Sequence, residues 1–204
     1  MLAAAGRRCE ARTTPATATR TVMTDRPTPP ADSLDPAFRR RVPHGDSLER
    51  DVCDRCGFVA YDNPKIVVGS VVRSPGGVMM CRRAIAPRIG FWTLPAGYLE
   101  HGETPEEGAR REALEEAGAA IELTSLLAVY TVRRLSQVQL IYRAELKGGY
   151  AAGPESLEVR EFGWEELPWD ALAFPSVAWA LEHERAVAAG ALAPFTNPGP
   201  DDDR

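Results

Sequence analysis

Hydrophobic and polar positions divide this chain into a leading stretch without periodicity and a longer region that predicts strands. Residues 1–36 are rich in Ala, Thr, Arg and Pro and show no repeating apolar face, so we expect them to be disordered. The pattern then changes, because the β-branched run Ile66–Val72 is followed by the turn residues Ser74–Gly77 and by the apolar run Val78–Cys81. Two such runs joined by a tight turn predict neighbouring strands.

Further strands and a closing helix are expected downstream. Apolar or alternating patterns predict strands at Trp92–Leu94, Leu123–Val132, Gln137–Leu146 and Glu158–Trp164. The third of these alternates regularly, so we expect it to be half-buried, with one side formed by Val138, Leu140, Tyr142 and Ala144. Apolar spacing predicts a helix over Pro175–Ala189, with Gly190 just past its end. Because strands dominate and two helices are placed to cover them, the pattern indicates a mixed α/β sandwich.

The clearest helix signal lies within GYLEHGETPEEGARREALEEAGA, residues 97–119. Thr104–Glu107 reads as a capping box with proline at the first helical position, and Gly118 is a natural stop. These signals predict a helix from about Pro105 to Ala117. Its Glu112, Glu115 and Glu116 stand at i, i+3 and i+4, which places the three carboxylates on one face.

Three acids on one face near the end of a helix are unfavourable for the helix itself. Like charges repel, and the negative end of the helix dipole adds to the repulsion. One interpretation is a solvated acidic face, partly neutralised by Arg110 and Arg111. The other is a cation bound opposite the carboxylates, and hard oxygen ligands of this kind suit Mg²⁺ or Mn²⁺ better than zinc.

Composition narrows the function classes and the compartment. The chain has 204 residues and a net charge of −5, which argues against a general nucleic-acid binder because phosphate neutralisation needs a basic face. No apolar run is long enough to cross a bilayer. Four cysteines do not resemble a secreted disulfide scaffold, so we expect a reducing, cytoplasmic location. Arg-rich and Thr-rich residues 1–35 also resemble an organellar transit peptide, although we favour Met23 as the true start.

The acidic stretch matches a family signature. Gly97, Glu103, Arg111, Glu112, Glu115, Glu116 and Gly118 occupy every fixed position of the Nudix box, G-x5-E-x7-R-E-U-x-E-E-x-G-U, in which U is apolar. The preceding GFWTLPAG and the strands that follow are also similar to this family, so the resemblance covers roughly residues 60–190. It implies a Nudix-type α/β/α sandwich with a mixed sheet. It also implies a hydrolase that cleaves a nucleoside diphosphate linked to another moiety.

The resemblance assigns candidate roles around the box. It makes Glu112 and Glu116 the principal ligands of Mg²⁺ or Mn²⁺, with Glu115 and the Gly97 carbonyl completing the site. Arg111 would hold a neighbouring carboxylate, and Glu103 would support Arg111 or bind the metal through water. The general base is left open among Glu115, Glu155 and Glu158; the last two are in a loop where acids are commonly surface residues.

Substrate contacts are less well defined by the sequence. Arg82, Arg83 and Arg88 precede the box and are candidates for phosphate binding, although exposed arginines are common on any surface. Tyr130 is a candidate for stacking on a base, although most aromatic residues near a sheet belong to the core.

The segment before the box resembles the entry to a Nudix subgroup with an N-terminal zinc ribbon. Such a ribbon uses two C-x-x-C knuckles for tetrahedral zinc, whereas only Cys53 and Cys56 are present here, with His44 as a possible third ligand. We therefore expect a relic knuckle without structural zinc. The expected organisation is a disordered extension at 1–36, a degenerate zinc-ribbon-like segment at 37–60, the hydrolase domain at 61–190 and a mobile acidic tail at 191–204.

The subgroup resemblance favours a small-molecule substrate, namely ADP-ribose or a dinucleotide such as FAD or NADH. It implies no nucleic-acid or membrane partner, and the family often forms homodimers. Two alternatives stay open. One is a non-catalytic nucleotide sensor on the same fold, against which the intact glutamates weigh. The other is a hydrolase of cap structures or dinucleoside polyphosphates.

Overall fold

The computed structural model describes residues 37–199. The predictions of disorder at 1–36 and of the start at Met23 lie outside the described residues, as does the end of the acidic tail. The chain divides into two compact units between Asp62 and Asn63. Among the described residues, no helix is long and apolar enough to cross a membrane.

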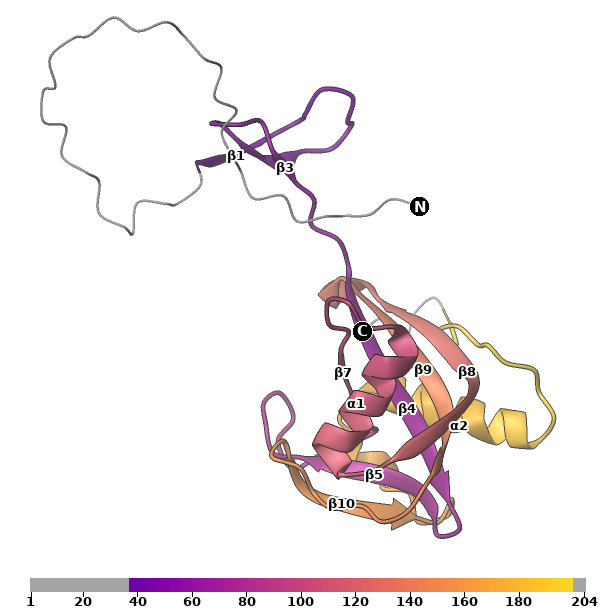
Figure 1. Cartoon of the computed structure of the whole chain (residues 1–204). Coiled ribbons are helices and arrows are strands. Elements are labelled where there is room, and N and C mark those ends of the chain that lie inside the picture. The colour runs from indigo at the N-terminus through magenta and orange to yellow at the C-terminus, as the bar shows by residue number, and fades with distance from the viewer. Residues whose placement is uncertain (1–36, 200–204) are drawn as a thin grey trace, which may run out of the picture. The chain divides into compact units, whose positions relative to one another are not determined.

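The first unit is a small antiparallel sheet with the order β1-β2-β3 (Figure 1). Its strands are β1 (Phe38–Arg41), β2 (Arg50–Cys53) and β3 (Val59–Ala60). The turn between β2 and β3 is closed by the Gly57 amide, which donates to the Cys53 carbonyl at 2.8 Å. Ion pairs from Arg39 and Arg41 to Asp54 hold β1 beside this turn.

The second unit contains a mixed sheet with the order β10-β5-β4-β9-β8, in which β6 pairs with β5 and β7 with β4. The strands are β4 (Lys65–Ser74), β5 (Gly77–Arg83), β6 (Trp92–Thr93), β7 (Ala96–Tyr98), β8 (Ile121–Val132), β9 (Gln137–Leu146) and β10 (Ser156–Phe162). Among the strand pairs of this sheet in the described residues, β4–β9 is parallel and the others are antiparallel. Two short 3-10 helices, Arg133–Leu135 and Trp169–Ala171, lie in the connections.

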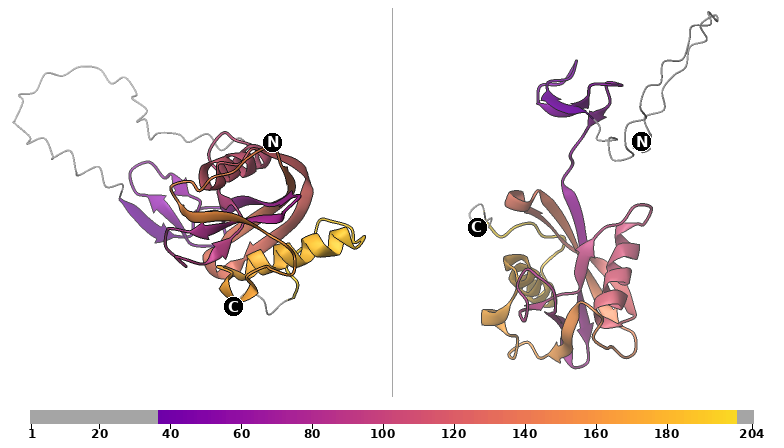
Figure 2. Two further views of the ribbon diagram at one scale, coloured as in Figure 1. Left: turned by 90° about the horizontal axis from the view of Figure 1, so that it is seen from below. Right: turned by 90° about the vertical axis from the view of Figure 1, so that its left-hand side faces the viewer.

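Two helices cover the two faces of this sheet (Figure 2). Helix α1 (Pro105–Ala117) packs on β4 and β7, and α2 (Pro175–Ala188) packs on β8 and β4. The α1 bounds, the capping box at Thr104 and the left-handed stop at Gly118 agree with the prediction from sequence. The predicted α/β/α sandwich with a mixed sheet is therefore confirmed.

Small residues let α1 lie close to the sheet. Ala109, Ala113 and Ala117 are fully buried beneath it. A side chain at Gly108 would place a Cβ 2.9 Å from the Val68 Cγ2 atom, so the helix and β4 are too close for anything larger. On the opposite face, α2 covers a larger apolar core that includes Leu127, Tyr130, Trp179 and Leu181. The acidic helix α1 thus packs on the face of the sheet that has the smaller apolar core.

Two expectations from the pattern need correction. Strand β9 is not half-buried on one side, because Ile141 is only 5% exposed and faces the α2 core, whereas Ala144 is buried on the α1 side. The described part of the predicted mobile tail is also bound. Phe195 donates its amide to the Leu127 carbonyl at 2.8 Å, and the Asn197 side chain pairs with the backbone of Thr131. This segment covers the free edge of β8.

Candidate active site

One continuous stretch of chain positions the acidic residues. Strand β7 pairs with β4 and places Gly97 opposite Val68. The chain then turns through residues 99–104 and enters α1, whose capping box fixes the direction of the helix. As a result α1 runs back over β7, with Glu112 and Glu116 directed inward. Their exposed fractions are 8% and 6%, whereas the side chain of Glu115 is 57% exposed.

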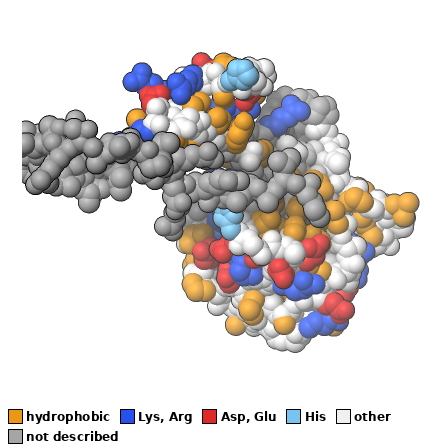
Figure 3. All heavy atoms as spheres, turned by 45° about the horizontal axis from the view of Figure 1, so that its top comes forward, with side chains coloured by type: hydrophobic (Ala, Val, Ile, Leu, Met, Phe, Trp, Pro, Cys, Tyr) orange, Lys and Arg blue, Asp and Glu red, His pale blue; other side chains and the backbone are white. Residues whose placement is uncertain are grey.

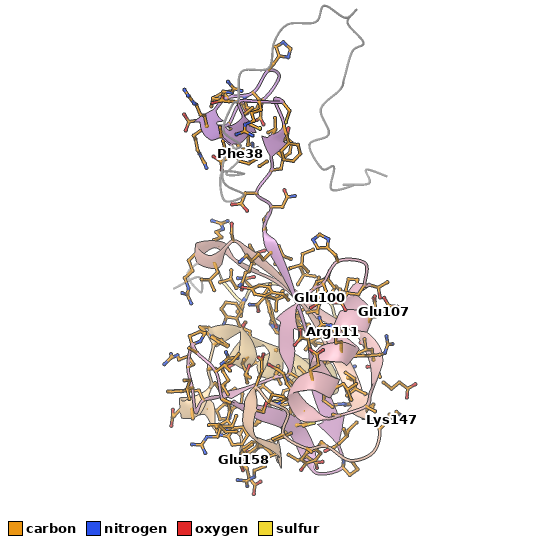
Figure 4. All side chains as sticks on the ribbon, turned by 60° about the vertical axis from the view of Figure 1, so that its left-hand side comes forward. Phe38, Glu100, Glu107, Arg111, Lys147 and Glu158 are labelled. Carbon is orange, nitrogen blue, oxygen red and sulfur yellow. The ribbon has the colours of Figure 1, made fainter. Side chains whose placement is uncertain are left out.

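Arg111, labelled on α1 in Figure 4, forms hydrogen bonds to several groups of the acidic stretch. It binds both oxygens of Glu103, with Nη2 donating to Oε1 at 2.8 Å and Nε donating to Oε2 at 3.1 Å. Its Nη1 donates to Glu112 Oε1 at 2.7 Å and to Glu115 Oε2 at 3.1 Å, and Nη2 also donates to the Tyr98 carbonyl. These bonds to Arg111 lower the pKa of Glu103 to about 2. The network holds the loop before α1 to the helix.

The Glu112 carboxylate lies directly against the backbone of Gly97. A Cβ atom at position 97 would fall 2.3 Å from Glu112 Oε1, so this position has no room for a side chain. Glycine is therefore required by the close approach of the carboxylate. The same approach brings the Glu112 oxygens next to the main chain of β7.

Glu116 is buried without a cationic partner. Its Oε2 accepts a hydrogen bond from the Ala96 amide at 3.0 Å, and it forms no ion pair with any described residue. Burial raises the pKa of Glu116 to about 7, and burial likewise raises the pKa of Glu112. Buried carboxylates of this kind are costly unless a cation or hydrogen bonds compensate them. The all-oxygen donor set and the deficit of positive charge fit Mg²⁺ or Mn²⁺.

The acidic side chains converge, although not as an open ligand cluster. Among residues 37–199, no group of three or more His, Cys, Asp or Glu side chains is arranged closely enough to hold a metal ion. The reason is visible at Arg111, whose guanidinium takes the position between Glu103, Glu112 and Glu115. The divalent metal site expected from the sequence stays a prediction.

A cleft of about 960 Å³ opens beside these groups. Its acidic wall is formed by Glu112, Glu115 and Glu116, together with Gly97. Apolar and aromatic residues from other elements complete it, including Ile85, Tyr98, Leu135, Ile141, Phe174 and Trp179. Figure 3 shows one face of the molecule, on which acidic and basic side chains lie interspersed.

The structure separates the candidate bases Glu155 and Glu158, which lie before and on β10. Glu155 lines the cleft, and its charge contributes to the raised pKa of Glu112 and, after burial and Glu112, of Glu116. Glu158 lies on β10 outside the cleft lining and pairs with Arg82 at 3.8 Å. Only the first of these two is therefore placed to act on a molecule in the cleft.

The predicted substrate contacts are placed elsewhere. Arg82 is outside the cleft lining and donates to the Gly90 carbonyl, and Arg88 stacks over Phe91. Tyr130 is fully buried, with its hydroxyl 2.7 Å from His183 Nδ1, so it does not reach a ligand. Its position in the core follows from the large apolar layer between β8 and α2.

Sequence reasoning missed several residues that do line the cleft. They lie in the β8–β9 connection, on β9 and at the start of α2, and they include Arg134, Gln137, Gln139, Phe174 and Trp179. Of the three arginines suggested by the sequence, Arg83 lines the cleft, because it faces the other side of β5 from Arg82. No comparable local signal marks residues that meet only through the fold.

The cysteine pair lies in the first unit. Cys53 is buried at the end of β2, and Cys56 is on the exposed turn that follows. His44 lies in the loop between β1 and β2. The relic knuckle without zinc stays a prediction.

Comparisons with known proteins add a family context. The family model described as NUDIX domain matches residues 63–183, and the model described as Nudix N-terminal matches residues 36–62. The crystal structure of a NUDIX hydrolase from Nitrosomonas europaea is 41% identical, with a TM-score of 0.73, over 78% of this chain and 92% of that chain.

Two curated relatives are also similar. An ADP-ribose pyrophosphatase from Methanocaldococcus jannaschii is 30% identical over 62% of this chain and 73% of its own length. A MutT-like protein from Streptomyces ambofaciens is 42% identical over 41% of this chain, and the match spans 52% of that protein. This chain thus covers about half of one of these relatives and about three quarters of the other.

Proposed function

This chain belongs to the Nudix family, and from that premise we propose that it is an Mg²⁺-dependent hydrolase of a nucleoside diphosphate linked to another group. One observation carries the proposal: the buried Glu116 carboxylate, which forms no ion pair with any described residue, lies beside the buried Glu112 on the wall of a cleft of about 960 Å³. A divalent ion would compensate this charge and give the cleft affinity for a diphosphate.

Glu112 and Glu116 would hold the ion, together with Glu115 and the Gly97 carbonyl, once Glu112 and Glu115 exchange their bonds to Arg111 for the ion. Bound Mg²⁺ supplies charge neutralisation at the diphosphate oxygens and lowers the pKa of a water molecule. Arg111 fixes Glu103 and keeps the loop before α1 in place, and its bonds to Glu112 and Glu115 hold these carboxylates near their working positions. Arg111 and Glu103 are thus positioning residues in this proposal.

Glu155 is the proposed proton acceptor. It lines the cleft from the segment before β10, whereas Glu112 and Glu116 belong to α1. It is near enough for its charge to raise the pKa of both. Glu115 is the other candidate, although it is more exposed and bonded to Arg111. A matched pair of variants distinguishes a catalytic role of Glu155 from the loss of any nearby surface charge. Glu155→Gln is expected to lower kcat at least a hundredfold, and Glu158→Gln to leave kcat within twofold.

The proposed substrate is ADP-ribose or a dinucleotide such as FAD or NADH. The cleft combines an acidic wall with aromatic side chains from Tyr98, Phe174 and Trp179. Such walls suit a molecule with an aromatic base on one side of its diphosphate. The name of the Methanocaldococcus relative, ADP-ribose pyrophosphatase, supports the same class.

A substrate panel tests the proposal. Purified protein with Mg²⁺ is offered ADP-ribose, FAD, NADH, a diadenosine polyphosphate and capped RNA, and the products are resolved by chromatography. We expect turnover of ADP-ribose or a dinucleotide, and loss of at least a thousandfold in kcat in Glu116→Gln, because one carboxylate ligand is lost. Glu165→Gln, whose side chain is 90% exposed, is the control. Tight binding of one compound with no turnover of any would instead identify a nucleotide sensor.

A further inference from the structure

Four ring side chains form a chain of contacts from the C-terminal segment to the wall of the cleft, here called the aromatic row. Phe195 stacks on His183 of α2, with ring centroids 4.2 Å apart and an angle of 6° between the planes. The centroid of the His183 ring is 5.8 Å from that of Tyr130 on β8, and Tyr130 meets Trp179 of α2 edge to face at 5.4 Å. Trp179 lines the cleft, and the other three lie outside its described lining. The row thus links a distant segment to the cleft wall.

A polar pair fixes the middle of the aromatic row. The Tyr130 hydroxyl lies 2.7 Å from His183 Nδ1, in a layer that is otherwise apolar. Phenylalanine would fill the same volume, and burying a hydroxyl is costly unless it is hydrogen-bonded. What the bond adds is direction, because it holds the Tyr130 ring in one orientation against α2. Trp179 is four residues before His183 and lies on the same face of the helix, so it packs on a ring that cannot turn freely.

The C-terminal segment, residues 195–197, holds the outer end of the row. Phe195 donates its amide to the Leu127 carbonyl at 2.8 Å and accepts from the Val129 amide at 2.9 Å. The Asn197 side chain accepts from the Thr131 amide at 2.9 Å and donates to the Thr131 carbonyl at 3.0 Å. These bonds to β8 fix the Phe195 ring in place, although the segment itself does not line the cleft.

The inner end of the row is sensitive to small movements. Trp179 is only 8% exposed, so a small part of its indole faces the cleft. Contact with a flat aromatic ligand depends on the relative orientation of the two rings. Because protein interiors are close-packed, a shift of Tyr130 must be taken up by its neighbours, and Trp179 is one of them. The orientation of this part of the cleft wall is therefore set by residues that no ligand touches.

We propose that Tyr130 and the C-terminal segment position Trp179 in the cleft wall, and that they thereby set the affinity of the cleft for the aromatic part of the substrate. Tyr130 is thus a positioning residue. The nature of the ligand in this inference rests on the proposed function, whereas the orientation of Trp179 does not. The two can be measured separately.

Fluorine NMR of the full chain labelled with fluorotryptophan reports on Trp179 without any ligand. Its resonance is the one that is missing from the spectrum of Trp179→Phe. Tyr130→Phe removes only a hydroxyl, and we expect it to shift or broaden the Trp179 resonance, because the ring beneath the indole is released. Tyr142→Phe is the matched control, since it removes a buried hydroxyl that donates to Glu106 on the α1 face of the sheet. An unchanged Trp179 resonance in Tyr130→Phe would overturn the proposal.

A second pair of variants tests the outer end of the row. Asn197→Ala removes both side-chain bonds to β8 and should change the Trp179 resonance in the same direction as Tyr130→Phe, but less. Leu192→Ala lies just before the segment and should leave the resonance unchanged, because its side chain is 90% exposed. Equal spectra for these two variants would remove the C-terminal segment from the proposal.

Ligand affinity tests the consequence for the cleft. With ADP-ribose and Mg²⁺, we expect Trp179→Leu to raise KM about tenfold, the usual effect of losing one stacked ring, and Tyr130→Phe to raise it about threefold, with kcat nearly unchanged. Inhibition by ribose phosphate, which lacks the base, should stay the same in both. Equal KM values for Tyr130→Phe and Tyr142→Phe would overturn the effect on affinity. If the wild type hydrolyses none of the panel, the hydrolase proposal fails, and the fluorine spectra still decide whether Tyr130 positions Trp179.

Discussion

Position 97 shows how one residue controls the geometry of the acidic wall. The absence of a side chain there lets the Glu112 carboxylate lie against β7, and the two elements are fixed by strand pairing and by the helix cap. Gly97 therefore has a steric role, in addition to any role of its carbonyl oxygen. Its backbone does not adopt a positive φ, so conformation alone does not require glycine.

Replacing Gly97 with alanine should displace Glu112. The added Cβ would meet Glu112 Oε1 at 2.3 Å and Oε2 at 2.5 Å, and the carboxylate must rotate away from its position. We expect kcat/KM for ADP-ribose to fall at least a hundredfold, because a small misplacement of a ligand is costly. Gly149→Ala is the control, since a Cβ at that position meets nothing within 4 Å. A Gly97→Ala enzyme as active as this control would contradict the steric role.

Helix α1 was predicted from sequence because all its signals are local. The capping box, the proline, the three-and-four spacing of the glutamates and Gly118 lie within one stretch, and the structure places the helix at the predicted bounds. The partners of Arg111 were only partly predictable. The bond to Glu103 follows from the family signature, whereas simultaneous bonds to Glu112 and Glu115 depend on the rotamer that packing selects.

Helix α2 illustrates what the sequence does not reveal. Its Glu184 is fully buried and receives two bonds from Arg143 of β9, at 2.6 and 2.8 Å. Arg73 of β4 approaches the same carboxylate at 3.4 Å. The partners are 41 residues or more apart, so no periodic pattern indicates that they meet. This buried cluster anchors α2, which carries Phe174 and Trp179 into the cleft.

Removing Arg143 should therefore destabilise the second unit. In Arg143→Met the Glu184 carboxylate stays buried with only the more distant Arg73, and breaking a buried pair on one side costs about 3–5 kcal/mol. We expect a clear fall in the urea midpoint of unfolding. Lys147→Met removes an exposed pair with Glu122 and should change the midpoint little. An Arg143→Met protein as stable as this control would show that the cluster does not anchor α2.

At the scale of the whole molecule, three distant parts of the chain meet at His183. Its ring lies between Tyr130 of β8 and Phe195 of the C-terminal segment, stacked on the latter at 4.2 Å. Burial lowers the pKa of His183, against an opposing effect of Glu182. The neutral ring is thus favoured in the folded protein.

Titration of His183 should make the protein less stable as the pH is lowered. Because the folded pKa lies below the ordinary value of 6.5, the unfolded chain takes up the proton first as pH falls. The contribution of neutral His183 is present above that value and is lost as pH falls through the folded pKa. We expect the difference in urea midpoint between wild type and His183→Gln to shrink between about pH 7.5 and pH 5. A difference independent of pH would exclude titration of His183 as its cause.

The whole-molecule arrangement also limits what the sequence can predict. The helices and most strands of the second unit followed from the sequence to within a few residues, whereas the sequence analysis did not predict β1, β2, β3 or β7. The acidic wall followed from one contiguous signature. The remaining cleft walls come from the loop after β5, the β8–β9 turn and the start of α2. Their meeting depends on the parallel β4–β9 pair, a long-range contact that no local pattern encodes.

That division of the cleft has a consequence for how such an enzyme diversifies. The groups assigned to bond cleavage sit mainly on a single short segment, whereas the surfaces that would select a ligand are scattered over separate loops. Mutation can therefore remodel recognition in one loop at a time without disturbing the hydrolytic centre. A lineage built on this scaffold can acquire new ligand preferences by gradual drift in its loops and keep its reaction throughout.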